Sequence, residues 1–209
     1  MKTAPPRMTI TLGVVIAASY LLIAYLGKVA AAGAVGGFIP ARLSGLMVVG
    51  ALPIWLTPLS CTLLHANALH LAFNLLMLGY CGREDEVALG RPGVLVLYVA
   101  GAYAAAAAQY LAGPHSMTPV VGASGAISAL VGAYALLYGQ RRPSTRFSPE
   151  TARTLHVLWL AGAWIVVQLL LGLASAIEGI GIAAAAHIGG FIAGLLLARP
   201  LLRWRYRKA

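Results

Sequence analysis

The chain has 209 residues, of which 60% are hydrophobic and only 10% are charged, and its mean hydropathy is +0.85. A water-soluble domain of this composition would aggregate, so the soluble classes are excluded and an integral membrane protein is expected. The formal net charge of +10 is spread over loop ends that flank apolar segments. That distribution fits anionic lipid headgroups better than nucleic acid.

Windows of about 20 apolar residues, enough to cross a hydrocarbon core roughly 30 Å thick, predict six transmembrane spans. They cover approximately residues 9–26, 57–81, 92–111, 122–138, 154–173 and 179–198. We therefore expect an all-α membrane protein, a bundle of six transmembrane helices, with residues 1–209 forming a single membrane domain. The first apolar run is longer than the core of a usual signal peptide, so we interpret it as a retained helix.

The basic residues predict the orientation of the spans. With a cytoplasmic N-terminus, all but two of the 15 Lys and Arg residues lie in cytoplasmic segments, and only Lys28 and Arg42 lie outside. The cytoplasmic set consists of Lys2, Arg7, Arg83, Arg91, Arg141, Arg142, Arg146, Arg153, Arg199, Arg203, Arg205, Arg207 and Lys208. Both termini are therefore expected in the cytoplasm. The short N-terminus, without an Arg- and Ser-rich presequence, favours a bacterial inner membrane.

The segment between the first two spans, residues 27–56, is rich in Gly and Ala and contains Phe38, Pro40 and Trp55. It is too apolar for a flexible aqueous linker. We expect it to pack on or partly within the outer leaflet as an interfacial element.

The cysteines do not predict a disulfide or a metal site. Cys61 and Cys81 are 20 residues apart. If one helix holds both, a rise of about 1.5 Å per residue separates them by roughly 30 Å, so they cannot pair. No metal-type spacing of Cys or His accompanies them, and no metal or other cofactor is expected.

Ser124 opens the fourth span within Gly-Ala-Ser-Gly, residues 122–125. Gly122 and Gly125 would let backbone and substrate approach closely, while the start of a helix leaves free N–H groups beside the hydroxyl. Such donors suit a nucleophile whose reaction develops an oxyanion. The alternative is a small residue at a helix-packing surface, and the Gly-x-Ser-Gly string alone favours packing.

His187 interrupts the apolar sixth span, where an ionisable side chain is costly and marks a candidate functional site. Its sequence neighbours offer no hydrogen-bond partner, so a neighbouring helix must supply one. Gly190 and Gly194 form a GxxxG face that lets such a helix come close. If Ser124 is the partner, an apolar environment favours the neutral imidazole, which can act as a general base. The alternative is a structural histidine bonded to a backbone carbonyl.

His70 and Asn74 are four residues apart in the second span, so they share one helical face and can donate hydrogen bonds toward the same point. Polar side chains on one face of a membrane helix usually point into the bundle. His65 lies about 140° round the helix from His70 at 3.6 residues per turn. We interpret His65 as a structural residue near the outer membrane surface that braces a loop.

Taken together, these motifs resemble the rhomboid family of intramembrane serine proteases. The matching pieces, in the family's order, are His65, HLAFN at residues 70–74, GASGAI at residues 122–127, and AHIGG at residues 186–190 with Gly194. The resemblance covers roughly residues 55–198. It implies a six-helix rhomboid bundle that cleaves other membrane proteins within or beside a transmembrane segment.

The resemblance also implies the roles of individual residues. The catalytic dyad would be Ser124 and His187, without a carboxylate, acting through an acyl-enzyme. The oxyanion hole would comprise His70, Asn74 and the backbone N–H of Ser124. Gly122 would keep the entering loop close to the substrate backbone, with Gly125, His65 and Gly190 in supporting positions.

Two positions depart from the family pattern. Many members carry a Trp-Arg pair in the first outside loop, whereas here Trp55 is followed by Leu56 and the nearest preceding arginine is Arg42. Members also often place Tyr or Phe four residues after the serine, against the histidine, whereas this chain has Ser128. Ser128 could hydrogen-bond nearby groups instead. Neither departure removes a catalytic group.

Two other functions remain open. A rhomboid-like protein without protease activity would bind membrane clients, although such proteins typically lack a dyad member. A small transporter with proton-relaying histidines predicts acidic groups at membrane depth. The acidic residues fall instead in loops or at span ends: Glu84, Asp85, Glu86, Glu150 and Glu178. The expected partners are transmembrane protein substrates and the lipid bilayer, not nucleic acid, and the oligomeric state is unknown.

Overall fold

The computed structural model describes residues 5–138, 148–177 and 183–207. Its longer helices are α1 (Arg7–Tyr25), α4 (Ala68–Met77), α5 (Arg83–Ala112), α6 (Ser124–Tyr138), α7 (Pro149–Ile177) and α8 (Ala184–Arg205). Its shorter helical segments are α2 (Val29–Gly36), η1 (Pro40–Arg42), η2 (Ile54–Leu56), α3 (Thr57–Ser60), η3 (Cys61–Leu63) and the π-helix η4 (Leu78–Gly82). The described residues contain no β-sheet, so the predicted all-α fold class is confirmed.

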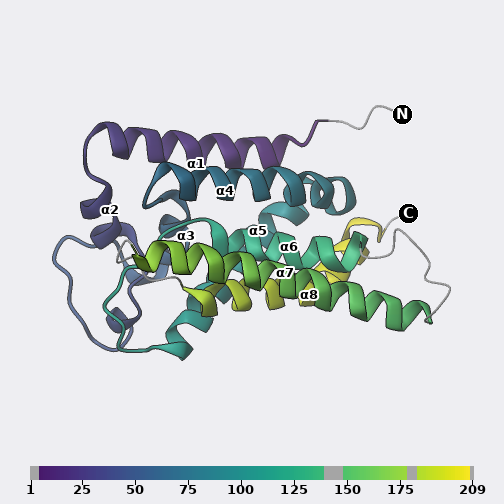
Figure 1. The fold of residues 1–209 in the computed structure, drawn as a ribbon. Helices are drawn as coiled ribbons and strands as arrows, with labels where there is room; N and C mark the ends of the chain where they lie inside the picture. The colour runs from purple at the N-terminus through teal and green to yellow at the C-terminus, as the bar shows by residue number, and fades with distance from the viewer. Residues whose placement is uncertain (1–4, 139–147, 178–182, 208–209) are drawn as a thin grey trace.

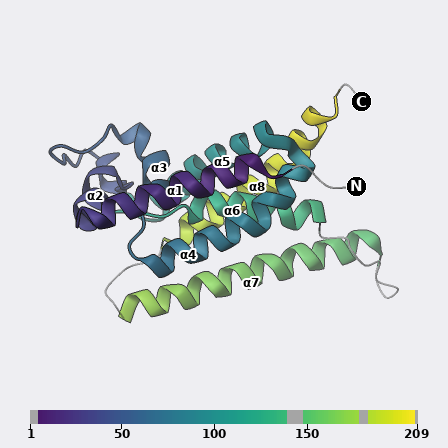
Figure 2. The ribbon, with the colours of Figure 1, turned by 90° about the horizontal axis from the view of Figure 1, so that it is seen from above.

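The helices lie side by side in a bundle, with both ends of the chain at the same end of it (Figure 1). Helices α5, α6 and α8 pack against one another. Buried residues of α6, among them Ile127 and Leu130, lie at the centre of the main apolar core. Helix α7 lies along one side of the bundle, as Figure 2 shows from above. The core is therefore built around α6, the helix that Ser124 begins.

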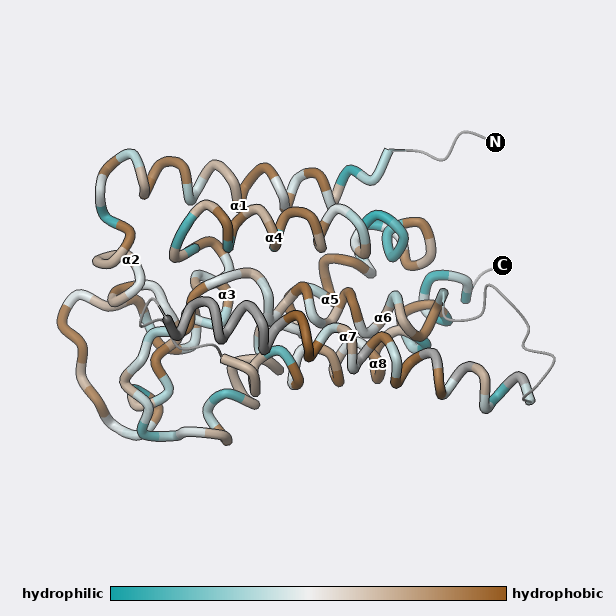
Figure 3. Tube along the Cα trace, viewed as in Figure 1, coloured by the Kyte–Doolittle hydropathy of each residue, from teal (hydrophilic) through white to brown (hydrophobic). Residues whose placement is uncertain are grey.

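Several of these helices are suited to a membrane. Among the described residues, three stretches are long and apolar enough to cross one: Arg7–Tyr25, Ala68–Ala112 and Ala184–Arg205. Shorter apolar helices cover Ile54–Leu63 and Ser124–Tyr138. Figure 3 shows hydrophobic residues along the helices and hydrophilic ones mainly toward the two ends of the bundle. The six-span count and the cytoplasmic termini stay predictions.

Some sequence-based expectations fall outside the described residues. These are the start of the predicted sixth span at Gly179, the acidic residue Glu178, and the basic residues Lys2, Arg141, Arg142, Arg146 and Lys208.

The prediction of one continuous helix over residues 57–81 is wrong at its start. After the short segments α3 and η3 the chain is extended at Leu64, and α4 begins only at Ala68. The Asn67 side chain caps this helix, accepting a 2.8 Å hydrogen bond from the His70 backbone N–H, which is why the helix begins here. His65 therefore precedes α4, and the predicted angle around a shared helix does not apply to it.

The two cysteines lie in different helical segments, η3 and η4, rather than in one helix. Both are buried free thiols, and the separation predicted for a shared helix does not apply to them.

Helix α5 begins before the predicted third span, at Arg83, and is interrupted at Gly90, whose φ of 73° is not helical. Pro92 lies in the first turn after this interruption, where a proline is tolerated because a backbone N–H there would have no partner within the helix. The predicted start at residue 92 thus corresponds to the part of α5 that follows the interruption.

Glu86, in the first part of α5, caps the start of α1. Its carboxylate accepts hydrogen bonds from Met8 N at 3.0 Å, Thr9 N at 2.9 Å and Thr9 Oγ1 at 2.9 Å. The residue before α1, Pro6, makes no side-chain cap, so Glu86 satisfies N–H groups that the helix leaves unpaired. Arg205 of α8 donates to the Val87 carbonyl at 2.6 Å, which ties α8 to the same place.

Small residues bring α6 and α8 into backbone contact. A Cβ atom at Gly190 would overlap the carbonyl oxygen of Gly125, and one at Gly194 would overlap that of Ala129. The close approach predicted from the GxxxG face is therefore confirmed, and the neighbouring helix is α6. This contact sets the position of His187 relative to Ser124.

Candidate active site

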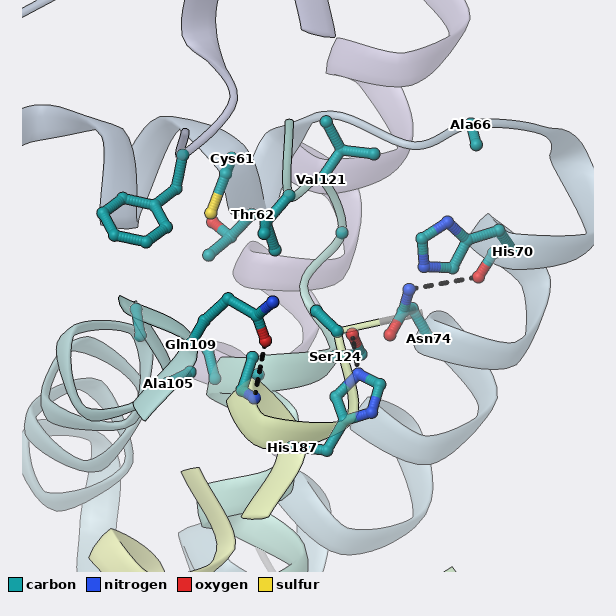
Figure 4. A pocket seen from close by; sticks show the side chains of 18 of the residues that line it. Cys61, Thr62, Ala66, His70, Asn74, Ala105, Gln109, Val121, Ser124 and His187 are labelled. Atoms are coloured by element: carbon teal, nitrogen blue, oxygen red, sulfur yellow. Dashed lines mark hydrogen bonds between the residues drawn. The ribbon is translucent and has the colours of Figure 1, made fainter. Parts of the chain in front are cut away.

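Ser124 and His187 meet where the first turns of α6 and α8 lie together. Ser124 Oγ and His187 Nε2 are 2.7 Å apart, a hydrogen-bond distance (Figure 4). The other ring nitrogen of His187, Nδ1, is buried without a hydrogen-bond partner among the described residues. With the ring hydrogen on Nδ1, Nε2 can accept the hydroxyl proton, as the base of a serine nucleophile must.

Gly122 shapes the segment that leads into Ser124. Its φ of +116° suits glycine, and a Cβ atom there would lie 2.6 Å from His70 Nε2. Its N–H donates to the Cys61 carbonyl at 2.9 Å. The absence of a side chain therefore lets the segment pass directly against His70.

His70 and Asn74 come from one face of α4 and lie on the same side of Ser124 (Figure 4). Asn74 is buried, and its Nδ2 donates to the His70 carbonyl at 3.1 Å. A side-chain amide has two N–H donors, so one remains for another acceptor. The arrangement gathers side-chain donors beside the serine.

His65 packs behind His70 instead of joining this group of donors. The two rings are 5.0 Å apart between centroids, and His65 also meets the Tyr20 ring of α1 edge-on at 6.3 Å. His65 is buried, and neither of its ring nitrogens has a hydrogen-bond partner among the described residues. Its contacts link α1 to the back of His70.

A pocket of about 1050 Å³ opens over these residues. Ser124, His187, His70 and Asn74 all line it, and most of its remaining lining is apolar. One wall comes from the segment before α6, where Val120 forms a two-residue antiparallel bridge with Phe38 through backbone hydrogen bonds of 3.0 and 2.8 Å. The long apolar segment between α1 and α3 thus contributes to the pocket.

That segment is held without the Trp-Arg pair common in the family. Arg42 Nη2 donates to the Leu52 carbonyl at 2.8 Å, which closes the loop on itself. Ala41 N donates to the Ser116 carbonyl at 3.0 Å, and residues 38–41 are buried. Arg42 therefore restrains this loop from a different sequence position.

Two residues at the site were not found from the sequence. Gln109 of α5 accepts a hydrogen bond from Ala186 N at 3.3 Å, at the start of α8 (Figure 4). Trp164 of α7 donates from Nε1 to Ser128 Oγ at 3.0 Å, and its ring centroid is 6.4 Å from that of His187. Gln109 is an isolated amide in an apolar span, so it carried the same kind of signal as His187 and was overlooked. A tryptophan in such a span carries no comparable signal. Ser128 does form hydrogen bonds nearby, as predicted.

A family model described as the rhomboid domain matches residues 54–204. The chain is 36% identical to the rhomboid protease GlpG of Pectobacterium atrosepticum over 140 residues, 66% of this chain and 46% of that protein. It is 35% identical over 136 residues to the proteins of the same name from Yersinia pestis and Yersinia pseudotuberculosis, 65% of this chain and 44% of each relative. The chain spans about half the length of the curated relatives it matches.

Proposed function

Because this chain belongs to the rhomboid family, we propose that it is an intramembrane serine endopeptidase that cleaves transmembrane segments of other membrane proteins. The catalytic residues are Ser124 and His187. The observation that carries the proposal is the 2.7 Å separation of Ser124 Oγ and His187 Nε2 in a pocket lined by further hydrogen-bond donors.

The first half of the reaction acylates the enzyme. Ser124 Oγ attacks the carbonyl carbon of the scissile peptide bond while its proton passes to His187 Nε2. The tetrahedral intermediate collapses, the C–N bond breaks, and His187 returns the proton to the departing amine. The N-terminal part of the substrate is then held as an ester on Ser124.

The second half releases this fragment. A water molecule gives a proton to His187 and attacks the ester carbonyl, and a second tetrahedral intermediate forms. Its collapse breaks the ester bond and returns the proton from His187 to Ser124 Oγ. No carboxylate takes part. His187 Nδ1 has no hydrogen-bond partner in the part of the chain that the structure describes, which is in keeping with a two-residue mechanism.

Both intermediates carry a negative oxygen that needs donors. The backbone N–H of Ser124, the second amide N–H of Asn74 and the His70 ring supply them. Gly122 supports this role because its missing side chain leaves His70 close to the serine. Donors fixed in place before the reaction stabilise the developing charge without reorganisation, which is usually a large part of catalysis.

The substrate class is supported by the apolar lining of the pocket. On α4, Leu69, Phe73 and Leu76 line it and are 63%, 39% and 65% exposed. In a bilayer such side chains face lipid, so a transmembrane segment can reach the pocket from the side. A helix hides its carbonyl groups in hydrogen bonds, so the best substrates are segments that unwind readily.

The single domain crosses a bacterial inner membrane six times, with both termini in the cytoplasm. An even number of crossings is in keeping with the two chain ends lying at one end of the bundle (Figure 1). The predicted cytoplasmic clustering of Lys and Arg gives the same orientation.

The proposal is tested by labelling the purified protein in detergent with a fluorophosphonate, which reacts with activated serines. The wild type is compared with Ser124→Ala and His187→Ala, and a transmembrane substrate is incubated with the same three proteins in liposomes. We expect labelling and cleavage by the wild type and neither by the two variants. A folded wild type that is neither labelled nor active would contradict the proposal and favour a client-binding protein.

A further inference from the structure

Trp164 of α7 contacts both members of the Ser124–His187 pair, one of them through Ser128. It is 7% exposed although its helix lies at the side of the bundle (Figure 2). Its indole N–H donates to Ser128 Oγ, and its ring meets the His187 ring nearly edge-on, with an interplanar angle of 68°. Among the α7 residues whose side chains the structure describes, no other is as buried.

Ser128 connects Trp164 to Ser124 through a second hydrogen bond. The Ser128 hydroxyl is fully buried and donates to the Ser124 backbone carbonyl at 2.7 Å. An indole N–H can only donate, so Ser128 Oγ must accept from it and keep its own hydrogen for the carbonyl. The order is therefore fixed: Trp164 donates to Ser128, and Ser128 donates to Ser124. Hydrogen bonds linked in this way strengthen each other in an apolar interior.

This link acts at a sensitive place, the first turn of α6. A serine that bonds back to the carbonyl four residues earlier often bends its helix slightly. The carbonyl concerned belongs to the nucleophile itself, so the bond bears directly on the position of Ser124. Because the Trp164 indole fixes the Ser128 hydroxyl, it limits how far the first turn of α6 can bend at Ser124.

The second contact acts on the base. His187 Nδ1 has no polar partner among the described residues, so the Ser124 hydroxyl is the hydrogen-bond partner that its ring has there. The remaining orientation of the ring must come from packing. Trp164 supplies an aromatic contact at a centroid distance of 6.4 Å, within the range of favourable edge-to-face pairs.

We propose that Trp164 is a positioning residue that orients the catalytic pair, holding Ser124 through the Ser128 hydroxyl and bordering the His187 ring directly. The inference rests on the proposed function, since it assigns a role in the reaction of that same site. If Trp164 has this role, the reactivity of Ser124 depends on how α7 is positioned in the bundle, although α7 contributes no reacting group.

The test measures fluorophosphonate labelling at several probe concentrations, which separates the maximal rate of inactivation from the probe's binding constant. Trp164→Phe keeps a ring beside His187 and removes the N–H, while Ser128→Ala removes the hydroxyl. We expect each variant to lower the maximal rate about tenfold, with the binding constant little changed. Because both disrupt one link, the double variant should fall about tenfold as well, not about a hundredfold.

Trp159→Phe is the matched control, because it makes the same replacement on the same helix at a side chain that is 67% exposed. Its labelling should equal that of the wild type. Equilibrium unfolding in mixed detergent micelles is measured for every variant, so that a loss of folded protein is corrected for in the rates.

Two results would overturn the inference while leaving the proposed function intact. One is a Trp164→Phe variant labelled as fast as the wild type, and the other is a double variant whose loss is the product of the two single losses. If the wild type is labelled no more than Ser124→Ala, the proposed function fails and this inference fails with it.

Discussion

Two buried polar clusters at different places in the bundle use their hydrogen bonds in opposite ways. In the first, the Glu86 cluster, a carboxylate accepts three hydrogen bonds from Met8 and Thr9 at the start of α1, and Arg91 lies 3.9 Å from it. In the second, the Ser124 cluster, Ser124 and His187 share one hydrogen bond, and His187 Nδ1 has no hydrogen-bond partner among the described residues. Asn74 donates one of its two amide N–H groups to the His70 carbonyl. The first lies against helix ends, and the second lines a pocket of about 1050 Å³.

The contrast relates the pairing of polar groups to their role: paired groups contribute to stability, and unpaired groups are available for function. A buried polar group that is fully paired stabilises the folded state, and one left unpaired costs free energy. On the proposed function, the unpaired groups of the Ser124 cluster are those that a reacting substrate would use. We therefore expect substitutions in the Ser124 cluster to lower the rate and substitutions in the Glu86 cluster to lower stability.

Outside the Ser124–His187 pair, the largest effect is expected for Asn74→Ala. Removing one side-chain donor of an oxyanion hole lowers kcat by about 10²–10³-fold, equivalent to roughly 2.7–4 kcal/mol. The measurement is the cleavage rate of a transmembrane substrate in liposomes, with equilibrium unfolding of the same variant as control. A kcat within a few fold of the wild type would remove Asn74 from the oxyanion hole.

Glu86→Gln should show the opposite pattern. The substitution keeps the shape but removes the charge that accepts from Met8 and Thr9, and hydrogen bonds to charged groups contribute roughly 1.5–3 kcal/mol. The free energy of unfolding in mixed micelles should fall by about that amount, with kcat of the folded fraction unchanged. A reduced kcat at unchanged stability would show that the two clusters are not separate.

Gly194→Ala tests the backbone contact that carries His187 toward Ser124. Its new Cβ atom would overlap the Ala129 carbonyl, so the free energy of unfolding should fall by roughly 1–3 kcal/mol, the usual cost of overpacking. Gly162→Ala on α7 is the matched control, because a Cβ atom there meets nothing within 4 Å. Equal unfolding free energies for the two variants would show that α6 and α8 can separate without loss.

The smallest effect is expected for Thr9→Val. This near-isosteric change removes one of the three hydrogen bonds to Glu86 and leaves the two backbone bonds in place. The free energy of unfolding should fall by about 0.5–1.5 kcal/mol. A loss as large as that of Glu86→Gln would place most of the cluster's contribution in the Thr9 hydroxyl.

Much of the candidate site was accessible from the sequence because isolated polar residues are conspicuous in apolar spans. Ser124, His187, His70 and Asn74 could be named, and the GxxxG pattern correctly indicated close helix packing, because each signal lies within a single helix. His65 was predicted to lie in the same helix as His70, but the Asn67 cap begins α4 only at Ala68 and leaves His65 outside that helix. Apolar residues on both sides of the cap conceal it from a hydropathy window.

The sequence by itself determined the membrane class, the all-α fold, the family and the residues of the candidate pair, since composition, helical period and short motifs are local properties. Only the tertiary structure decided which groups meet across helices. The hydrogen bonds of Trp164 with Ser128 and of Glu86 with the start of α1 join positions 36 and about 78 residues apart. Such contacts depend on how whole helices pack, because the partners share neither a helix nor a repeating pattern that could mark them in advance.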